Sequence, residues 1–302
     1  MNYEEFKESI LGKIRDFYGE SADVDTTKMN RNNGISYEGI RISHKGAEHK
    51  VLPLIRLDAL YEAYSSGIMG MEECVEKVCS GSESNEITES MEAFVKRISN
   101  WDFIRESIYP ILLTTKDNGE LLEKLVSVPM LDLSVAYIIR MKLEDDISGN
   151  IKITRQIFDM FRISPEELHR QAIENLEKDG YVFCEIEALM LKMLNIEIPE
   201  TEQEDDEEHK KTYVLTNESR IYGAAGILNE RLLRQFAGDQ DYFILPASIH
   251  ETIFIPATDM SDKEIFDNMV AETNSTVVDV EERLSDHCYF YDGGTGKIRM
   301  CA

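Results

Sequence analysis

The sequence predicts an α+β fold in which helices pack on mixed or antiparallel sheets. Apolar residues recur at steps of three and four in some segments, as on one face of a helix, and alternate with polar residues in others, as in a half-buried strand. The two kinds of segment follow one another along the chain. An Asn-Gly pair and two serine-initiated capping boxes stand at borders between them, so turn and cap chemistry agrees with the periodicity.

Residues 1–80 are expected to form a small α+β module. A helix at 2–18 is predicted by apolar side chains at helical spacing, namely Tyr3, Phe6, Ile10, Ile14 and Phe17. Strands follow at 22–29 and 35–43, and Asn33-Gly34 between them favours the positive φ angles of a tight hairpin turn. The other predicted elements are a strand at 49–57 and helices at 58–64 and 71–78.

Residues 87–198 are expected to form a first β-α-β-β-α unit. A Ser- and Glu-rich stretch at 80–86 separates this unit from the N-terminal module. Its first helix contains the single tryptophan, Trp101, and a capping box at Ser164 begins a later helix. The predicted elements are helices at 87–106, 120–124 and 165–178, strands at 109–114, 134–141, 151–158 and 181–184, and a helix that ends near 194.

Residues 212–302 are expected to form a second β-α-β-β-α unit with a C-terminal hairpin. The stretch 199–211 precedes it, and seven of the nine residues from Glu200 to Glu208 are acidic, which is typical of a solvated linker or loop. A second capping box begins at Ser261. The predicted elements are strands at 212–215, 242–246 and 250–255, helices at 219–236 and 262–274, and a hairpin of 289–291 with 297–300.

The two units repeat the same order of elements, which predicts an internal duplication. The strand that begins at Ile111 corresponds to the strand that begins at Tyr213, and residues 130–139 correspond to 244–253. The second correspondence has a sequence offset of 114. Equivalent helices docked on opposite faces of the sheet would contradict the duplication.

The charge balance excludes several function classes. The chain carries 58 acidic and 32 basic residues, a formal net charge of -26. A field of this sign repels phosphate backbones and anionic lipids, so neither direct nucleic-acid binding nor membrane association is expected. It suits a protein partner with a basic surface.

Targeting and cysteine patterns favour a cytoplasmic protein. The N-terminal residues lack the basic and apolar regions of a signal peptide, and the most apolar stretches are far below the ~20 residues of a membrane helix. The five cysteines are irregularly spaced and form no CxxC motif, which indicates free thiols in a reducing compartment.

Three short motifs resemble known sites and fail on spacing or context. Gly293-Gly-Thr-Gly-Lys297 lacks the spacing, hydroxyl residue and following helix of a phosphate loop, so we interpret it as a hairpin turn. His250-Glu251 lacks the second histidine of a zinc-protease helix, since position 254 is Phe254. Gly223-Ala-Ala-Gly226 is interpreted as a site of close packing, and the sequence indicates no organic cofactor.

The richest polar cluster combines Ala247-Ser-Ile-His-Glu251 with Leu284-Ser-Asp-His-Cys-Tyr289. The candidate catalytic residues are Ser248, His250, Glu251, Asp286, His287 and Cys288, with Ser285 beside them. A serine or cysteine nucleophile, a histidine base and a carboxylate could be assembled from this set. Alternatively, a metal ion could be bound by His250, Glu251, Asp286 and His287. A third interpretation is a polar network that fixes turns.

Several strings in the chain look like an uncharacterised Firmicutes family. The most specific are Ser-Ile-His-Glu at 248–251 and Leu-Ser-Asp-His at 284–287, and Asn-Asn-Gly-Ile at 32–35 and Pro-Leu-Ile-Arg-Leu at 53–57 are also similar. The family is known as domain of unknown function 5688. The resemblance implies a bacterial cytoplasmic protein and supplies no activity, so no catalytic residue is carried over from it.

These observations lead us to expect a role in protein interaction or regulation. One alternative is a hydrolase or metal-dependent enzyme that uses His250, Asp286 and His287. The other is an acidic inhibitor that mimics nucleic acid and occupies the basic surface of a DNA- or RNA-binding protein. Converging histidine and carboxylate side chains in a pocket would favour the enzyme, and a rigid acidic face would favour the mimic.

Overall fold

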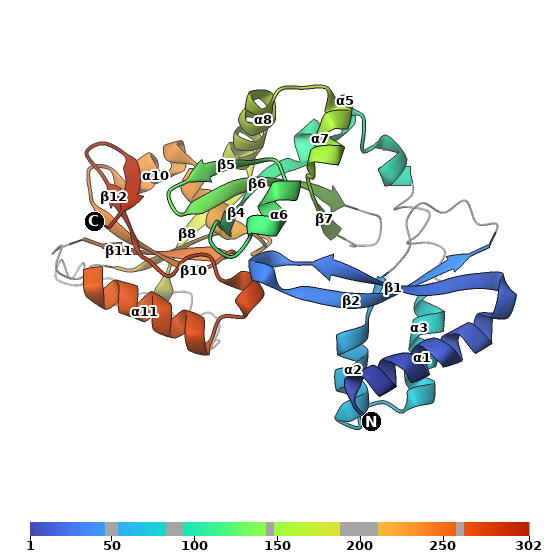
Figure 1. The fold of residues 1–302 in the computed structure, drawn as a ribbon. Coiled ribbons are helices and arrows are strands. Elements are labelled where there is room, and N and C mark those ends of the chain that lie inside the picture. The colour runs from blue at the N-terminus through green and yellow to red at the C-terminus, as the bar shows by residue number, and fades with distance from the viewer. Residues whose placement is uncertain (46–53, 83–92, 143–147, 188–210, 258–262, 302) are drawn as a thin grey trace, which may run out of the picture. The chain divides into compact units, whose positions relative to one another are not determined.

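In the computed structural model the chain forms two compact bodies (Figure 1). The N-terminal body contains residues 1–103 and 142–148, and the C-terminal body contains residues 104–141 and 149–302. The structure describes residues 1–45, 54–82, 93–142, 148–187, 211–257 and 263–301. Helices combine with three antiparallel sheets, which confirms the predicted α+β class.

In the described part of the N-terminal body, three helices cover one face of a three-stranded sheet (Figure 1). The strands, in the order β1-β2-β3, are β1 (Ala22–Asn30), β2 (Ser36–His44) and β3 (Leu54–Arg56). The helices are α1 (Tyr3–Tyr18), α2 (Leu57–Ser65) and α3 (Met71–Ser82). Between β1 and β2, Asn33 and Gly34 have φ of 57° and 72°, which confirms the predicted hairpin turn.

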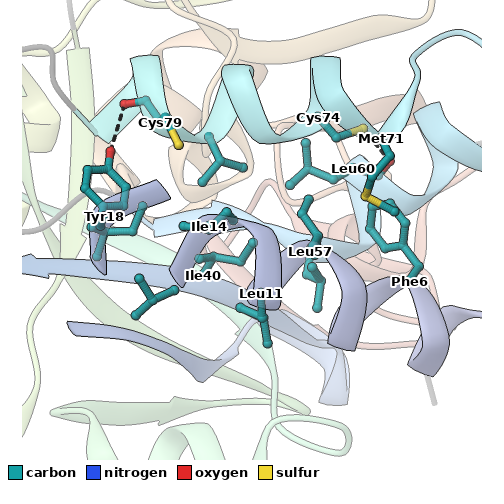
Figure 2. Close-up of a cluster of buried hydrophobic side chains, with 14 of the residues drawn as sticks. Phe6, Leu11, Ile14, Tyr18, Ile40, Leu57, Leu60, Met71, Cys74 and Cys79 are labelled. Carbon is teal, nitrogen blue, oxygen red and sulfur yellow. Dashed lines mark hydrogen bonds between the residues drawn. The ribbon is translucent and has the colours of Figure 1, made fainter. Parts of the chain in front are cut away.

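Helix α1 begins with a full capping box and buries one apolar face. Asn2 Oδ1 accepts from the amide of Glu5, and Glu5 Oε2 accepts from the amide of Asn2, both at 2.9 Å. Figure 2 shows side chains of α1, including Phe6, Leu11 and Ile14, in the core of this body. The sequence predicts Phe17 on the buried face, but Tyr18 is buried there instead and Phe17 is 62% exposed. The turn of 3.6 residues carries the buried stripe from Ile14 to Tyr18.

The predicted helix at 87–106 is not continuous. The chain is helical at 93–97, leaves the helix at 98–100, and resumes in α5 (Trp101–Ile104). A Ser99-Asn100 pair occupies the break, and such residues compete with the helix by bonding to nearby backbone groups. Residues 87–92 of that prediction, and 49–53 of the predicted strand at 49–57, lie outside the described residues.

The C-terminal body contains the other two sheets. The four-stranded sheet has the order β4-β6-β5, with β7 paired to β6; its strands are β4 (Ile108–Thr114), β5 (Ser127–Met130), β6 (Leu133–Lys142) and β7 (Ser148–Lys152). The six-stranded sheet has the order β13-β12-β10-β11-β9-β8; its strands are β8 (Tyr181–Glu185), β9 (Tyr213–Asn217), β10 (Tyr242–Ser248), β11 (Glu251–Pro256), β12 (Tyr289–Asp292) and β13 (Lys297–Met300).

Each sheet of this body has helices on both faces. The helices are α6 (Gly119–Lys124), α7 (Arg155–Phe161), α8 (Pro165–Lys178), α10 (Glu230–Ala237) and α11 (Lys263–Thr276). Leu121 of α6 packs with Ile111 on one face of β4, and Asn175 of α8 donates to the carbonyl of Ile108 at 2.9 Å. On the six-stranded sheet, Phe236 of α10 contacts Tyr242, while α11 packs near Phe243. Alternation along β10 therefore directs successive side chains to different helices.

Two predicted elements in the C-terminal body are wrong in part. The predicted strand 151–158 ends at Lys152, because Thr154 caps α7 by accepting from the amide of Ile157 at 3.2 Å. The predicted helix 219–236 is a 3₁₀ segment, η4 (Gly223–Leu228), followed by α10. The chain cannot be helical before η4, since Arg220 and Tyr222 have φ of 53° and 55°.

The two predicted repeats share an order of three paired strands. β4 pairs with β6 and β6 with β5, just as β9 pairs with β11 and β11 with β10. The hairpin turns lie at 131–132 and 249–250, an offset of 118, so the sequence alignment of these hairpins with an offset of 114 is out of register by four residues. Duplication of the unit, and the domain boundaries at 1–80, 87–198, 199–211 and 212–302, stay predictions.

Candidate functional site

The predicted polar cluster lies in the C-terminal body, at the β10–β11 turn and in the loop before β12. The two segments touch where the amide of Ile249 donates to the carbonyl of Glu282 at 2.8 Å. His250 stands at this junction. Its Nδ1 accepts from the amide of Tyr222 at 3.2 Å, and its Nε2 lies 3.4 Å from Glu282 Oε1.

These contacts assign one tautomer to His250. Because Nδ1 accepts a hydrogen bond, its lone pair is engaged, and the ring proton belongs on Nε2 beside the Glu282 carboxylate. A general base needs a free lone pair that faces its substrate. Both ring nitrogens of His250 instead contact groups of the protein itself, so this arrangement fixes the turn.

The other residues of the β10–β11 turn support it locally. Ser248 Oγ accepts from the amide of His250 at 3.0 Å, a bond that closes a short turn. Glu251 begins β11 and stands opposite Ser248 in the strand register. Behind the turn, Thr216 Oγ1 donates to the carbonyl of His250 at 2.9 Å. The turn is therefore held by hydrogen bonds between the hydroxyls of Ser248 and Thr216 and the backbone of His250.

The loop before β12 gives Asp286, His287 and Cys288 separate partners. Asp286 Oδ1 accepts from Asn274 Nδ2 at 3.0 Å, and the amide of His287 donates to Ser285 Oγ at 3.1 Å. The amide of Cys288 donates to Asp267 Oδ1 at 2.8 Å. The contact with the β10–β11 turn is therefore made by Glu282, just before the second predicted segment, whereas Asp286 and Cys288 are bonded to α11.

A carboxylate that the sequence did not single out joins the two sheets. Asp132, in the β5–β6 turn, accepts from Ser285 Oγ at 2.8 Å and from the hydroxyl of Tyr289 at 2.7 Å. Both donors are buried, and burial raises the pKa of Tyr289 far above its usual range. The hydroxyls therefore stay protonated and donate, and Asp132 forms the centre of a structural clamp (Asp132, Ser285 and Tyr289).

A metal site is a separate question from catalysis. Among the described residues, no three His, Cys, Asp or Glu side chains come close enough together to hold a metal ion.

The glycine motifs serve packing: a side chain at Gly223 would overlap the carbonyl oxygen of His250, and one at Gly226 would overlap the ring of Tyr181. Gly293 to Gly296 form the turn between β12 and β13.

An open groove of about 830 Å³ lies in the N-terminal body between α1 and α3. We call it the α1–α3 groove and define it by its lining residues, Lys13, Asp16, Phe17, Glu72, Val75, Glu76, Cys79 and Ser80. Its base is apolar: Cys79 is buried in the core shown in Figure 2, where its carbonyl accepts from the hydroxyl of Tyr18 at 3.4 Å. The half-buried Val75 and the exposed Phe17 leave apolar surface open above this base.

The rim of the α1–α3 groove is negatively charged. It carries three carboxylates, Asp16, Glu72 and Glu76, against the single ammonium of Lys13, a net charge of -2. Lys13 Nζ donates to Glu72 Oε1 at 3.1 Å across the groove. This hydrogen bond lowers the pKa of the Glu72 carboxyl, which is therefore ionised at neutral pH.

The lining residues favour binding over catalysis. A nucleophilic site needs a serine or cysteine with a base in hydrogen-bond reach. The hydroxyl of Ser80 instead donates to the carbonyl of Lys77 at 3.3 Å, and Cys79 is 5% exposed. No histidine is among the residues that line the groove. The accessible chemistry is an apolar floor with carboxylates around it.

Comparison with known proteins identifies the family. The model of a family of unknown function, DUF5688, matches residues 3–293, which cover both the groove and the clamp. The chain belongs to this family. No curated protein and no solved structure matches the chain. Membership of DUF5688 therefore assigns no chemistry, and a function has to be argued from the geometry.

Sequence reasoning missed both the clamp and the groove. Asp132 is 153 residues from Ser285, so a search for local polar strings finds one side of the clamp alone. The groove did leave a signal in the sequence. The spacing of apolar residues predicts five of them on the buried face of the opening helix. With 3.6 residues per turn, Phe17 is the one that lies off this face, and it lines the groove. Within the described residues, no helix is long and apolar enough to cross a membrane.

Proposed function

We propose that this protein is a binding module for a partner protein, and that the α1–α3 groove receives a basic amphipathic helix of that partner. The observation that carries the proposal is Phe17, a large apolar side chain that is 62% exposed at the edge of an apolar groove. Exposed apolar surface rimmed by polar groups is typical of interaction sites. A groove between two helices suits the helix-in-groove mode of recognition.

Charge selects the kind of helix. The three carboxylates of the rim and the formal net charge of -26 attract Lys and Arg and repel acidic or phosphate-bearing ligands. The segment 83–92, which follows α3 in the sequence, carries four glutamates and no basic residue, so its charge does not suit the groove. A helix with one apolar side and Lys or Arg beside it matches both the floor and the rim.

A defined peptide probe tests this proposal. The probe is a labelled helical peptide with Leu on one face and Lys on the other, and its binding is followed by fluorescence anisotropy. Two matched peptides are needed: one with Glu in place of Lys, and one with the same Leu and Lys residues in scrambled order. We expect the amphipathic basic peptide to bind at least about tenfold more tightly than either, since binding requires both apolar contact and charge.

Two variants locate the binding site. Phe17→Ser removes the exposed ring and is expected to weaken peptide binding about tenfold, or roughly 1.4 kcal/mol. Ile68→Ser is the matched control, because Ile68 is 77% exposed in the same body and does not line the groove. Equal binding of the amphipathic and scrambled peptides, or equal affinity of the Phe17→Ser and Ile68→Ser proteins, would overturn the proposal.

Two alternatives to this proposal stay open, an enzyme and a nucleic-acid mimic, and the structure bears on them differently. The bonds of His250 and Asp286 to neighbouring groups give the enzyme hypothesis no added support. A nucleic-acid mimic would also bind a protein with a basic surface, but it would do so through an acidic face and not through the α1–α3 groove. If binding of a basic DNA-binding protein competes with DNA and is unchanged by Phe17→Ser, the mimic is favoured over the groove.

A further inference from the structure

Two cysteines face each other at the edge of the six-stranded sheet. Cys288 directly precedes β12 and Cys301 directly follows β13. The register that pairs Tyr289 with Met300 continues one step outward and places Cys288 opposite Cys301. Their Sγ atoms are 3.3 Å apart, and the thiol of Cys288 donates to Cys301.

This position suits a disulfide. Directly opposed residues of antiparallel strands have Cα atoms roughly 4.5–5.5 Å apart, within the roughly 4.4–6.8 Å that a disulfide spans. The sulfur atoms need to approach by about 1.2 Å to reach the bond length of about 2.05 Å. The amide of Cys288 is fixed by its bond to Asp267 Oδ1, so rotation of the side chains suffices.

The two thiols differ in reactivity. The hydrogen bond from Cys288 lowers the pKa of Cys301, whereas the hydrogen bond to Cys301 and burial raise the pKa of Cys288. The thiolate is the nucleophilic form of cysteine. Cys301 is 8% exposed and Cys288 is 0% exposed, so the more acidic thiol is also the more accessible one.

We propose that Cys288 and Cys301 are a modification site that forms a reversible intramolecular disulfide on exposure to a hydroperoxide. The Cys301 thiolate attacks one oxygen of hydrogen peroxide, the O–O bond breaks, and hydroxide leaves, which gives a sulfenic acid on Cys301. The sulfur of Cys288 then attacks that sulfur, the S–O bond breaks, and water leaves with the proton of Cys288. The two thiols lose two electrons, and one peroxide becomes two waters. A dithiol reductant reverses the change.

The remaining cysteines do not share this geometry. Cys74 and Cys79 are five residues apart in α3, so their backbones are separated by about 7.5 Å along the helix axis, too far for a disulfide. Cys184 lies in β8 at the opposite side of the sheet. Five strand spacings of about 4.8 Å place it roughly 24 Å from β13. Oxidation is therefore expected to be specific to one pair.

The disulfide would act on the last strand. Among the described strands, β13 is bonded to β12 and lies at the end of the sheet order. A bond between 288 and 301 closes a covalent ring around the β12–β13 hairpin. We expect the backbone amides of 297–300 to exchange hydrogen more slowly in the oxidised protein, since opening of the edge strand then strains the ring.

Peptide mapping of the wild-type protein tests the proposal directly. The reduced full chain is treated with hydrogen peroxide, remaining thiols are alkylated under denaturing conditions, and trypsin is added. Cleavage after Arg283, Lys297 and Arg299 separates the two cysteines into fragments 284–297 and 300–302. We expect these fragments to be recovered as one linked species that dithiothreitol separates. The number of alkylated cysteines should fall from five to three, as two of the five enter the bond.

Two variants complete the test. Cys301→Ser is expected to keep its four thiols after peroxide treatment, because Cys288 loses its partner. Cys184→Ser is the matched control and should still form the linked fragment. The mapping of the wild-type chain decides the question even if Cys301→Ser folds poorly. Alkylation of all five cysteines after peroxide treatment, a link between two copies of the chain, or Cys288 recovered as an unpaired sulfinic acid would overturn the proposal.

Discussion

The two bodies differ in what they leave unsatisfied. In the C-terminal body, polar residues in and around the predicted cluster are paired: Ser285 and Tyr289 donate to Asp132, and His250 contacts Tyr222 and Glu282. In the N-terminal body, an apolar residue, Phe17, is exposed beside carboxylates. Buried polar groups are normally hydrogen-bonded, so their presence alone indicates structure. An exposed aromatic ring at a groove is the less expected observation, and it is the better guide to a binding site.

The largest effect that we expect from this comparison is the loss of the clamp. Asp132→Ala leaves the buried hydroxyls of Ser285 and Tyr289 without their acceptor, and each uncompensated group costs about 1–3 kcal/mol. We expect the free energy of unfolding of the C-terminal body to fall by about 3 kcal/mol. Hydrogen exchange of the β12 amides measures this locally.

Asp132→Asn is the control for the clamp. The amide oxygen still accepts a hydrogen bond, so the expected loss is smaller than for Asp132→Ala. If Asp132→Ala leaves exchange of β12 within about 0.5 kcal/mol of the wild type, Asp132 is not a structural acceptor. The polar cluster would then regain its interest as a functional site.

A pair of glycine substitutions gives effects of opposite sign in the two bodies. A Cβ at Gly223 would overlap the carbonyl oxygen of His250 and the hydroxyl of Thr216, so we expect Gly223→Ala to destabilise by about 2 kcal/mol. A Cβ at Gly12 in α1 meets nothing within 4 Å. Gly12→Ala is therefore expected to stabilise by about 0.5–1 kcal/mol through helix propensity. Urea unfolding measures both, and effects of the same sign would contradict the packing assigned to η4.

The smallest expected effect is a pH dependence in the N-terminal body. Lys7 Nζ lies 2.5 Å from Glu38 Oε1, and this hydrogen bond lowers the pKa of Glu38. A lowered folded-state pKa means that the contribution to stability is present above the unfolded value of 4.5 and is lost as pH falls through the folded value. We expect Glu38→Gln to destabilise by about 0.5 kcal/mol at pH 7 and less at low pH.

The exposed Glu8 on α1 provides the control for this pH effect. Glu8→Gln removes one carboxylate at an exposed position of the same body, and we expect its free energy of unfolding at pH 7 to stay close to that of the wild type. Urea midpoints measured at several pH values compare the two variants. If the loss in free energy of unfolding caused by Glu38→Gln does not become smaller at low pH, the Lys7–Glu38 pair is not the cause of that loss.

Local chemistry explains which parts of the fold were predictable from the sequence. The helix at 2–18, the turn at Asn33-Gly34 and the cap at Ser164 rest on interactions between residues a few positions apart, and all are present. The strand predicted at 151–158 failed because the same apolar residues serve a helix once Thr154 caps it. The helix predicted at 219–236 failed because long-range contacts hold residues before Gly223 in left-handed conformations.

The candidate sites were less predictable because they depend on distant pairings. The strings around His250 and Asp286 were correctly recognised as polar, but their partners Tyr222, Asn274 and Asp132 come from other elements. The groove requires α1 and α3 to lie beside each other. The periodicity of apolar residues within one helix does not predict which other helix packs next to it. The one sign of the groove in the sequence is Phe17, an apolar residue of α1 that the core does not bury.

The charged side chains of β13 affect the tendency of this protein to aggregate at high concentration. In the part of the chain that the structure describes, it is the outermost strand of its sheet, and a bare strand edge can recruit another chain into a fibril. Lys297 and Arg299 alternate along it and are exposed. Lys297 also pairs with Glu230 at 3.2 Å, and charged side chains on an edge strand discourage the addition of another strand at this side of the molecule.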